Sequence, residues 1–125
     1  MQLASLAMMN FRRTLGASTL THDRVVNLAG EDIGRVEELM IDVITGRVAY
    51  AVLSFGGILG YGGKLFAMPW SALTVDEGKQ RFLANVTKDA LEKMPGFDKT
   101  HWPDLSDLDY ANGVYRQWGV TPYWA

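Results

Sequence analysis

The stretch that decides the fold runs from Thr45 to Phe55 and reads TGRVAYAVLSF. Its threonine and glycine signal a tight hairpin turn, because glycine readily adopts the positive φ that such a turn needs. The apolar residues that follow fall on both faces of a strand: Val48, Tyr50 and Val52 on one, and Ala49, Ala51, Leu53 and Phe55 on the other. A strand with two apolar faces is normally buried on both sides, with other parts of the protein packed against each face. We therefore expect a barrel interior against one face and a helix, the chain's tail or a second subunit against the other.

The residues before this turn complete the predicted hairpin. Residues 35–43 alternate near their end, with Leu39, Ile41 and Val43 on one face and Met40 and Asp42 on the other. The pair Glu37-Glu38 interrupts the alternation, which indicates a β-bulge at that point. An earlier strand is predicted over residues 24–28, and it ends at the turn signal of residues 29–32.

Three further strands are predicted after the hairpin, over residues 65–70, 73–75 and 81–86. Pro69 lacks a backbone N–H, so it places the first of them at a sheet edge or a bulge. Short strands separated by regular turns are typical of small barrels and sandwiches. We predict a mainly β fold, a small antiparallel β-barrel of about six strands followed by C-terminal helices.

Two helices are predicted after the strands. Thr87 caps the first, and Pro95-Gly96 ends it. Ser106 caps the second, and Gly119 ends it. The second helix carries an amphipathic stripe formed by Leu108, Ala111, Tyr115 and Trp118. We therefore divide the chain into an N-terminal arm (1–17), a barrel-like domain (18–86) and a helical extension (87–125) that packs on the barrel or on a dimer partner.

The composition excludes several classes of function. The 125 residues include no cysteine, so disulfides, thiolate nucleophiles and cysteine metal sites are absent. The net charge of −2 gives no general attraction to nucleic acid or to an anionic membrane. The longest uncharged run, residues 48–63, is interrupted by glycines and is shorter than the ~20 apolar residues of a membrane helix. We expect a soluble, cytoplasmic protein with no membrane span and no nucleic-acid partner.

No residue pattern in the sequence predicts catalysis or a bound cofactor. His22 and His101 are far apart, and neither has a metal-ligand neighbour at close helical or strand spacing. Asp104, Asp107 and Asp109 precede or begin a helix, where the helix dipole stabilises acidic side chains. The glycine-rich residues 56–64 lead into a strand, whereas a phosphate-binding loop leads into a helix. We predict no metal, no cofactor and no enzymatic activity.

A family resemblance supports the same fold. Residues 18–86 resemble the PRC-barrel domain family, named after the cytoplasmic part of the photosynthetic reaction centre H subunit. The resemblance lies in the order and spacing of five segments, namely VVNL (25–28), GEDIGRV (30–36), ID (41–42), TGRVAY (45–50) and AMPWSAL (67–73). It implies an assembly or docking role in place of catalysis, and the tail resembles that of stand-alone bacterial members. By family analogy alone, it also suggests a role in a photosynthetic electron-transfer complex or in ribosome maturation.

We therefore predict a non-catalytic docking module that forms a homodimer and binds a protein partner still to be identified. The candidate contact residues are large apolar and aromatic side chains on the glycine-rich loop, after the Pro69 strand and in the tail. They are Ile58, Leu59, Tyr61, Trp70, Trp118, Tyr123 and Trp124. The alternative function is a small-molecule or anion-binding module at the barrel mouth near the glycine-rich loop, where Tyr61, Lys64 and Trp70 would supply polar groups.

Overall fold

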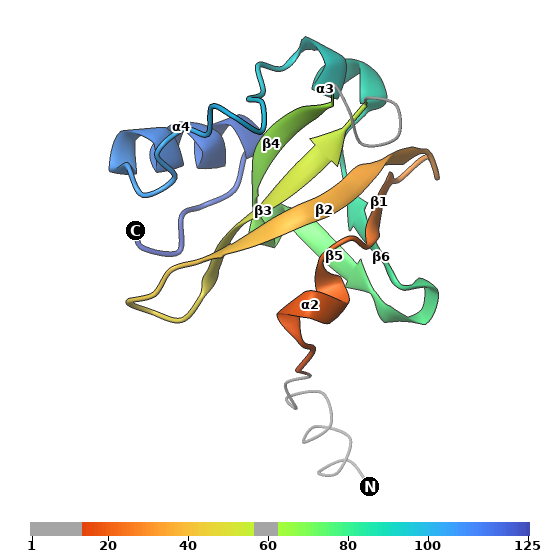
Figure 1. Cartoon of the computed structure of the whole chain (residues 1–125), viewed down its shortest axis with the longest axis horizontal. Helices are drawn as coiled ribbons and strands as arrows, with labels where there is room; N and C mark the ends of the chain where they lie inside the picture. The colour runs from red at the N-terminus through yellow and green to blue at the C-terminus, as the bar shows by residue number, and fades with distance from the viewer. Residues whose placement is uncertain (1–13, 57–62) are drawn as a thin grey trace, which may run out of the picture.

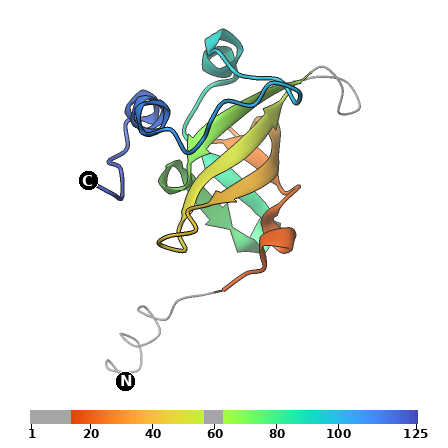
Figure 2. The same cartoon turned by 60° about the vertical axis from the view of Figure 1, so that its left-hand side comes forward.

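The computed structural model describes residues 14–56 and 63–125, and these residues form one curled sheet with helices at its ends and on one side (Figures 1 and 2). The strands are β1 (Arg24–Asn27), β2 (Asp32–Ile41), β3 (Val48–Phe55), β4 (Lys64–Pro69), β5 (Leu73–Asp76) and β6 (Arg81–Ala84). The α-helices are α2 (Ala17–Leu20), α3 (Lys88–Lys93) and α4 (Leu108–Trp118), and the 3-10 helices are η1 (Trp70–Ala72) and η2 (Glu77–Lys79).

The six strands pair in the order β4-β3-β2-β1-β6-β5, which confirms the predicted mainly β, barrel-type fold. Neighbouring strands run antiparallel, except that β1 and β6 run parallel. The parallel pair joins Arg24 to Arg81 and Asn27 to Ala84, so it brings the start and the end of the barrel sequence together. This pairing between segments far apart in the sequence lies within the sheet, and β4 and β5 form its two edges.

The predicted bulge in β2 is present. Val36 pairs with Leu53 and Glu38 with Val52, so Glu37 is the extra residue. Because the bulge shifts the alternation, the buried residues of β2 are spaced by three: Ile33, Val36 and Leu39. A second irregularity follows Met40, and β2 ends at Ile41, two residues earlier than expected. The structure then turns at Gly46, whose φ of 77° confirms the predicted hairpin turn.

The barrel interior is filled by side chains from both halves of the sheet. Val25, Val36, Met68 and Phe82 have no exposed surface, and Ile33, Ala51 and Leu53 complete the centre of the cluster. Leu20 of α2 and Leu91 of α3 belong to the same cluster. Figure 1 shows these two helices at opposite ends of the sheet, so each closes one end of the interior.

The second face of β3 is covered by α4 of the same chain. Tyr50 of β3 and Ala67 of β4 pack against Ala111, Val114 and Tyr115 of α4 in a second apolar cluster. The Tyr115 hydroxyl donates a hydrogen bond of 2.6 Å to the carbonyl oxygen of Ala49. The two-sided burial expected from the sequence of β3 is therefore present, and the cover is a helix.

The edge strand β4 is covered by the chain between α3 and α4. Pro69 ends β4 at one edge of the sheet, as its missing N–H requires. On the free side of β4, Leu65 forms an isolated antiparallel bridge with Phe97. This close approach depends on Gly96, because a Cβ at that position would lie 2.7 Å from the Leu65 carbonyl oxygen.

The helix boundaries match the sequence except at the start of α4. Thr87 caps α3, with its Oγ1 accepting from the Ala90 N–H, and Gly119 ends α4 with φ 69°. The N-cap of α4 is Asp107, not the predicted Ser106. Leu108 is 59% exposed, so it lies outside the buried stripe, and Val114 takes a place in it. A stripe of Ala111, Val114, Tyr115 and Trp118 has ordinary helical spacing.

Gly34 provides a direct test of this sheet geometry. It pairs with Val25 at a register shift between β1 and β2, has φ 137°, and a Cβ there would lie 2.0 Å from the Ser54 carbonyl oxygen. We expect Gly34→Ala to lower the free energy of unfolding by about 3 kcal/mol or more, since the backbone of β3 would have to move. Urea denaturation measures this loss.

Gly113→Ala is the matched control for this test. Gly113 lies within α4, and a Cβ there would have no atom within 4 Å. The substitution is expected to raise the free energy of unfolding by up to ~1 kcal/mol, because alanine favours the helix. Equal stability of Gly34→Ala and the wild-type chain would contradict the described register.

Candidate functional site

The C-terminal tail folds back and forms an aromatic cluster on α4. The ring of Trp124 lies 4.7 Å from that of Tyr115 and 5.0 Å from that of Tyr123, both in edge-on arrangements. Tyr115 in turn contacts Tyr50 of β3 with ring centroids 6.0 Å apart. Rings in these geometries attract each other beyond the area that they bury. The tail is therefore continuous with the packing that covers β3.

The tail is also attached to the β2–β3 hairpin by polar contacts. The Tyr123 hydroxyl donates a hydrogen bond of 2.6 Å to Asp42 Oδ2. Asp42 Oδ1 accepts from the backbone N–H groups of Ile44 and Thr45, at 3.0 and 3.3 Å. The Arg47 guanidinium lies 5.3 Å from the centre of the Tyr123 ring. One carboxylate therefore shapes the hairpin turn and holds the tail.

These contacts shift the pKa values of both partners in opposite directions. The hydrogen bond from Tyr123, together with those from the backbone, lowers the pKa of Asp42 below its usual 3.8. Burial, reinforced by the hydrogen bond to Asp42, raises the pKa of Tyr123 to about 12. The contact at neutral pH therefore joins a carboxylate to a protonated phenol, a charge-assisted hydrogen bond.

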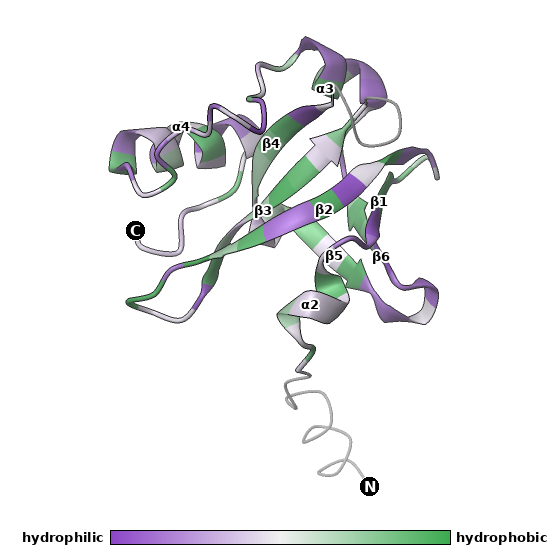
Figure 3. Ribbon diagram, viewed as in Figure 1, coloured by the Kyte–Doolittle hydropathy of each residue, from purple (hydrophilic) through white to green (hydrophobic). Residues whose placement is uncertain are grey.

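The hairpin turn presents large apolar side chains to solvent. Val43 is 87% exposed and Ile44 is 90% exposed. Leu108 at the start of α4 and Trp124 in the tail are exposed nearby, around a groove of about 430 Å³ between the hairpin and α4. We call the four residues Val43, Ile44, Leu108 and Trp124 the hairpin face. Figure 3 shows the hydrophobic colouring of the hairpin tip, which projects from the sheet.

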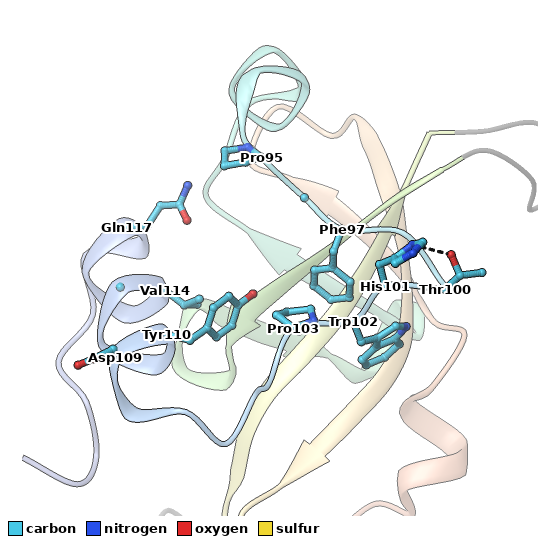
Figure 4. Close-up of a pocket in the computed structure, with 12 residues that line it drawn as sticks. Pro95, Phe97, Thr100, His101, Trp102, Pro103, Asp109, Tyr110, Val114 and Gln117 are labelled. Atoms are coloured by element: carbon cyan, nitrogen blue, oxygen red, sulfur yellow. Dashed lines mark hydrogen bonds between the residues drawn. The ribbon is translucent and has the colours of Figure 1, made fainter.

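A second groove lies between α4 and the segment that joins α3 to α4. It has a volume of about 710 Å³, and we call it the linker groove. Figure 4 shows Tyr110 and Gln117 reaching toward it from α4, opposite Pro95, Phe97 and Pro103 of the joining segment. The Phe97 and Trp102 rings are 5.2 Å apart. Aromatic and proline side chains therefore form part of the lining, beside polar residues and glycines.

Two polar residues that line the linker groove, Thr100 and His101, bind the neighbouring Asp98. Thr100 Oγ1 donates a hydrogen bond of 2.7 Å to Asp98 Oδ1, and His101 Nδ1 lies 3.0 Å from the same oxygen. The hydrogen bond from Thr100, followed by that from His101, lowers the pKa of Asp98 to about 2. These three residues form an exposed turn, and their arrangement accounts for the shifted carboxyl without a ligand.

The structure brings together only part of the predicted contact set. Tyr123 and Trp124 lie in one cluster, and Trp118 lies between the two apolar clusters. Trp70 packs against Phe82 with ring centroids 5.8 Å apart. Ile58, Leu59 and Tyr61 lie outside the described residues.

Sequence reasoning missed Val43 and Ile44 as contact residues. The signal was present, because two aliphatic residues stand between Asp42 and Gly46, where a hairpin turn normally carries polar side chains. Val43 was instead assigned to the end of a strand, and Ile44 was assigned to no element. The hairpin face therefore emerges only once β2 is seen to end at Ile41.

The structure places two of the three residues predicted for the alternative ligand site at the barrel mouth, Lys64 and Trp70. Lys64 and Trp70 flank β4 at opposite ends. Lys64 Nζ donates to the carbonyl oxygens of Glu92 and Met94, at 3.0 and 3.5 Å. These two side chains therefore do not converge on one site, and the barrel interior between them is filled.

Within residues 14–56 and 63–125, no three histidine or acidic side chains are grouped so that they could hold a metal ion. None of the helices in the same ranges is long and apolar enough to cross a membrane.

Comparison with known proteins gives a family match. The profile of the PRC-barrel domain matches residues 13–91. Among solved structures, one neighbour is RimM of Pseudomonas aeruginosa, described as a 16S ribosomal RNA processing protein, with 12% sequence identity and a TM-score of 0.43. The likeness covers 62% of this chain and 47% of that one, so this chain spans about half the length of that relative. No curated protein matches the sequence.

The Tyr123–Asp42 contact predicts a pH dependence of stability. Because the pKa of Asp42 is lower in the folded chain than its ordinary value of 3.8, the contact stabilises the fold above about pH 4. This stabilisation is lost as the pH falls through the lowered pKa. We expect Tyr123→Phe to lower the Tm at neutral pH and to reduce the fall in Tm between about pH 5 and pH 3.

Differential scanning calorimetry across this pH range measures the effect. Tyr110→Phe is the control, because Tyr110 lies on the linker groove and makes no contact with Asp42. If Tyr123→Phe and the wild-type chain show the same pH profile, the contact does not couple the tail to the hairpin.

Proposed function

This chain belongs to the PRC-barrel domain family, and we propose that it is a non-catalytic docking module that assembles through its hairpin face. The observation that carries the proposal is the exposure of Val43 and Ile44 at the tip of the β2–β3 hairpin, beside an apolar groove. An exposed cluster of this kind is typical of interaction sites.

The energetic argument starts from the two aliphatic residues in the turn. Fully burying a valine or isoleucine side chain contributes roughly 1.5–3 kcal/mol. Turn positions tolerate polar residues without strain, so folding alone does not require aliphatic side chains at 43 and 44. Burying these two side chains in an interface would therefore contribute hydrophobic free energy to association, which the isolated domain cannot gain because both remain exposed.

The contacts of the tail make this face rigid before binding. Asp42 fixes the turn through the N–H groups of Ile44 and Thr45, and Tyr123 fixes Asp42 to the tail. A surface that is already ordered loses less conformational entropy when a partner binds. The hairpin face therefore has the pre-organisation expected of a docking surface.

The partner that fits this surface best is a second copy of the chain. The hairpin tip is an apolar projection, and the neighbouring groove of about 430 Å³ is an apolar hollow lined by Met40, Ala49 and Ala111. A projection beside a matching hollow is self-complementary, which is the requirement of a two-fold interface. Each tip would enter the groove of the other protomer, and a larger assembly would build on the dimer.

The non-catalytic assignment rests on how the titratable groups are used. The lowered pKa of Asp42 and that of Asp98 both come from hydrogen bonds that shape turns. Burial raises the pKa of Tyr110 and that of Tyr115, so both phenols stay protonated at neutral pH. None of these shifts places a general acid or base near physiological pH.

A second candidate function is ligand binding, and the linker groove is the observation in its favour. Its volume of about 710 Å³ lies within the range of small-molecule sites, and aromatic rings line it. A thermal-shift screen distinguishes the two functions: a ligand whose stabilisation is lost in Tyr110→Ala but kept in Val43→Asp would favour the linker groove.

The docking proposal predicts the oligomeric state of two variants. We expect the wild-type chain to be a dimer at micromolar concentration, and the double variant Val43→Asp, Ile44→Asp to be a monomer. Two buried carboxylates would be desolvated at the interface, which disfavours association strongly. Size-exclusion chromatography with light scattering measures both.

Leu28→Asp is the matched control. Leu28 is 70% exposed and follows β1, away from the hairpin face, so this variant should remain a dimer. Circular dichroism establishes that all the variants are folded. A monomeric wild-type chain, or a dimeric double variant, would overturn the proposal.

A further inference from the structure

One side of the linker groove is a single face of α4. The four residues that this helix contributes beyond its first turn recur at positions i, i+3, i+4 and i+7, which lie on one helical face. They are Tyr110, Gly113, Val114 and Gln117. Gly113 therefore lies in the middle of this side, and its missing side chain leaves the helix backbone open to the groove.

The folded chain does not require glycine at position 113. Gly113 is not among the glycines with positive φ, and a Cβ there would meet no atom of the described residues within 4 Å. Apart from proline, glycine is the least favourable residue in a helix interior. Glycine is useful where another molecule approaches the backbone closely. The groove is therefore shaped for a ligand that lies directly against α4.

The other side of the groove presents flat rings. The rings of Phe97 and Trp102 are 5.2 Å apart and inclined by 59°, and Trp102 is 39% exposed. Figure 4 shows Tyr110 pointing from α4 toward Phe97, with Pro103 beside them. Aromatic-lined grooves are the surfaces on which proline-rich segments dock in the polyproline II conformation.

The hydrogen-bonding groups of the groove suit the same kind of segment. Within residues 14–56 and 63–125, the Trp102 indole, the Tyr110 hydroxyl and the Gln117 amide form no hydrogen bond with another side chain or with the backbone. All three groups can donate. A polyproline II segment has no internal hydrogen bonds, and its prolines offer carbonyl acceptors without N–H donors. The donors of the groove therefore complement the acceptors of such a segment.

The charge of the groove favours a basic segment. Asp109 lines the groove in the first turn of α4, and it forms no ion pair among the described residues. No lysine or arginine lines the groove in the described part of the chain. The nearby Lys99 lies 3.4 Å from Glu37, so its charge is already paired. A lysine or arginine next to the prolines of a partner would therefore complement Asp109.

We propose that the linker groove binds a proline-rich segment of another protein, with a lysine or arginine of that segment beside Asp109. The proposal rests on the same groove as the second candidate function and names its occupant as a peptide. It is independent of the hairpin face, because no residue lines both grooves. A polyproline II segment is stiff before it binds, so it loses little conformational entropy on docking.

Fluorescence anisotropy with the full chain tests the proposal. The probe is a labelled peptide of about nine prolines with an arginine at each end, which spans roughly 28 Å between the arginines as a polyproline II helix. The control peptide keeps both arginines and replaces the prolines by alternating glycine and serine. We expect saturable binding of the proline peptide, at least about ten-fold tighter than that of the control peptide.

Gly113→Leu tests the site within the chain. Leucine favours the helix, and its side chain would fill the space that the segment needs. We expect it to weaken binding of the proline peptide at least about ten-fold. Asn112→Leu is the matched control, because Asn112 lies on the same helix and lines neither groove, so it should bind as the wild-type chain does.

Two further measurements separate the parts of the proposal. Asp109→Asn should weaken binding about three-fold at low salt, and the difference should disappear at high salt. The indole N–H signal of Trp102 in a ¹⁵N–¹H spectrum, assigned with Trp102→Phe, should shift when the proline peptide is added. The double variant Val43→Asp, Ile44→Asp should keep the wild-type affinity, so failure of the hairpin face and failure of this site are distinguishable.

Four outcomes would overturn the proposal. They are no binding of the proline peptide at millimolar concentration, equal binding of the glycine–serine peptide, and unchanged affinity in Gly113→Leu. The fourth is a small molecule from the thermal-shift screen whose binding Gly113→Leu abolishes while the proline peptide does not bind, which would assign the groove to a small ligand. Circular dichroism establishes that each variant is folded.

Discussion

The two-sided burial of β3 is the constraint on which the rest of the structure depends. Ala51 and Leu53 fill the barrel interior, while Tyr50 on the opposite face lies against Tyr115 of α4. Exposing either apolar face of this strand to water would be unfavourable, so the outer face must be covered by an element outside the sheet. The helix α4 supplies that cover, and the hydrogen bond from Tyr115 to Ala49 fixes its position along the strand.

The position of α4 in turn determines the surface that the domain presents. Because Tyr115 is fixed on β3, the tail that follows α4 passes beside the β2–β3 hairpin, where Tyr123 binds Asp42 and Trp124 packs on Tyr115. The start of α4 places Leu108 near the same hairpin. The hairpin face is thus assembled from three segments that are distant in sequence, and each is held by the packing that covers β3.

Local patterns in the sequence predicted the elements that depend on local physics. The two-sided burial of β3, the bulge at Glu37, and the glycine positions 46 and 119 were confirmed. The predicted faces were wrong at the start of β3, where a register shift places Val48 with the interior cluster and Ala49 with Tyr50. The confirmed features are set by side-chain alternation and by backbone conformation within a few residues. The family resemblance, carried by the order of several such features, was confirmed by the profile match.

Features that depend on distant contacts were not accessible from the sequence. The parallel pairing of β1 with β6 joins segments more than fifty residues apart, and no local pattern indicates its direction. Leu108, the first residue of α4, was expected in the buried stripe but is 59% exposed, because burial at a helix end depends on what the distant chain places beside it. The hairpin face could not be predicted for the same reason, because the exposure of Val43 and Ile44 depends on where β2 ends.

Hydrogen exchange measured at several protein concentrations tests the central claim, that α4 covers β3 within one chain, most directly. We predict that the amides of β3 are among the most protected in the chain and keep the same protection across a roughly hundred-fold range of concentration, because their cover is intramolecular. Protection of β3 that rises with concentration would contradict this account, since it would mean that a second subunit covers the strand.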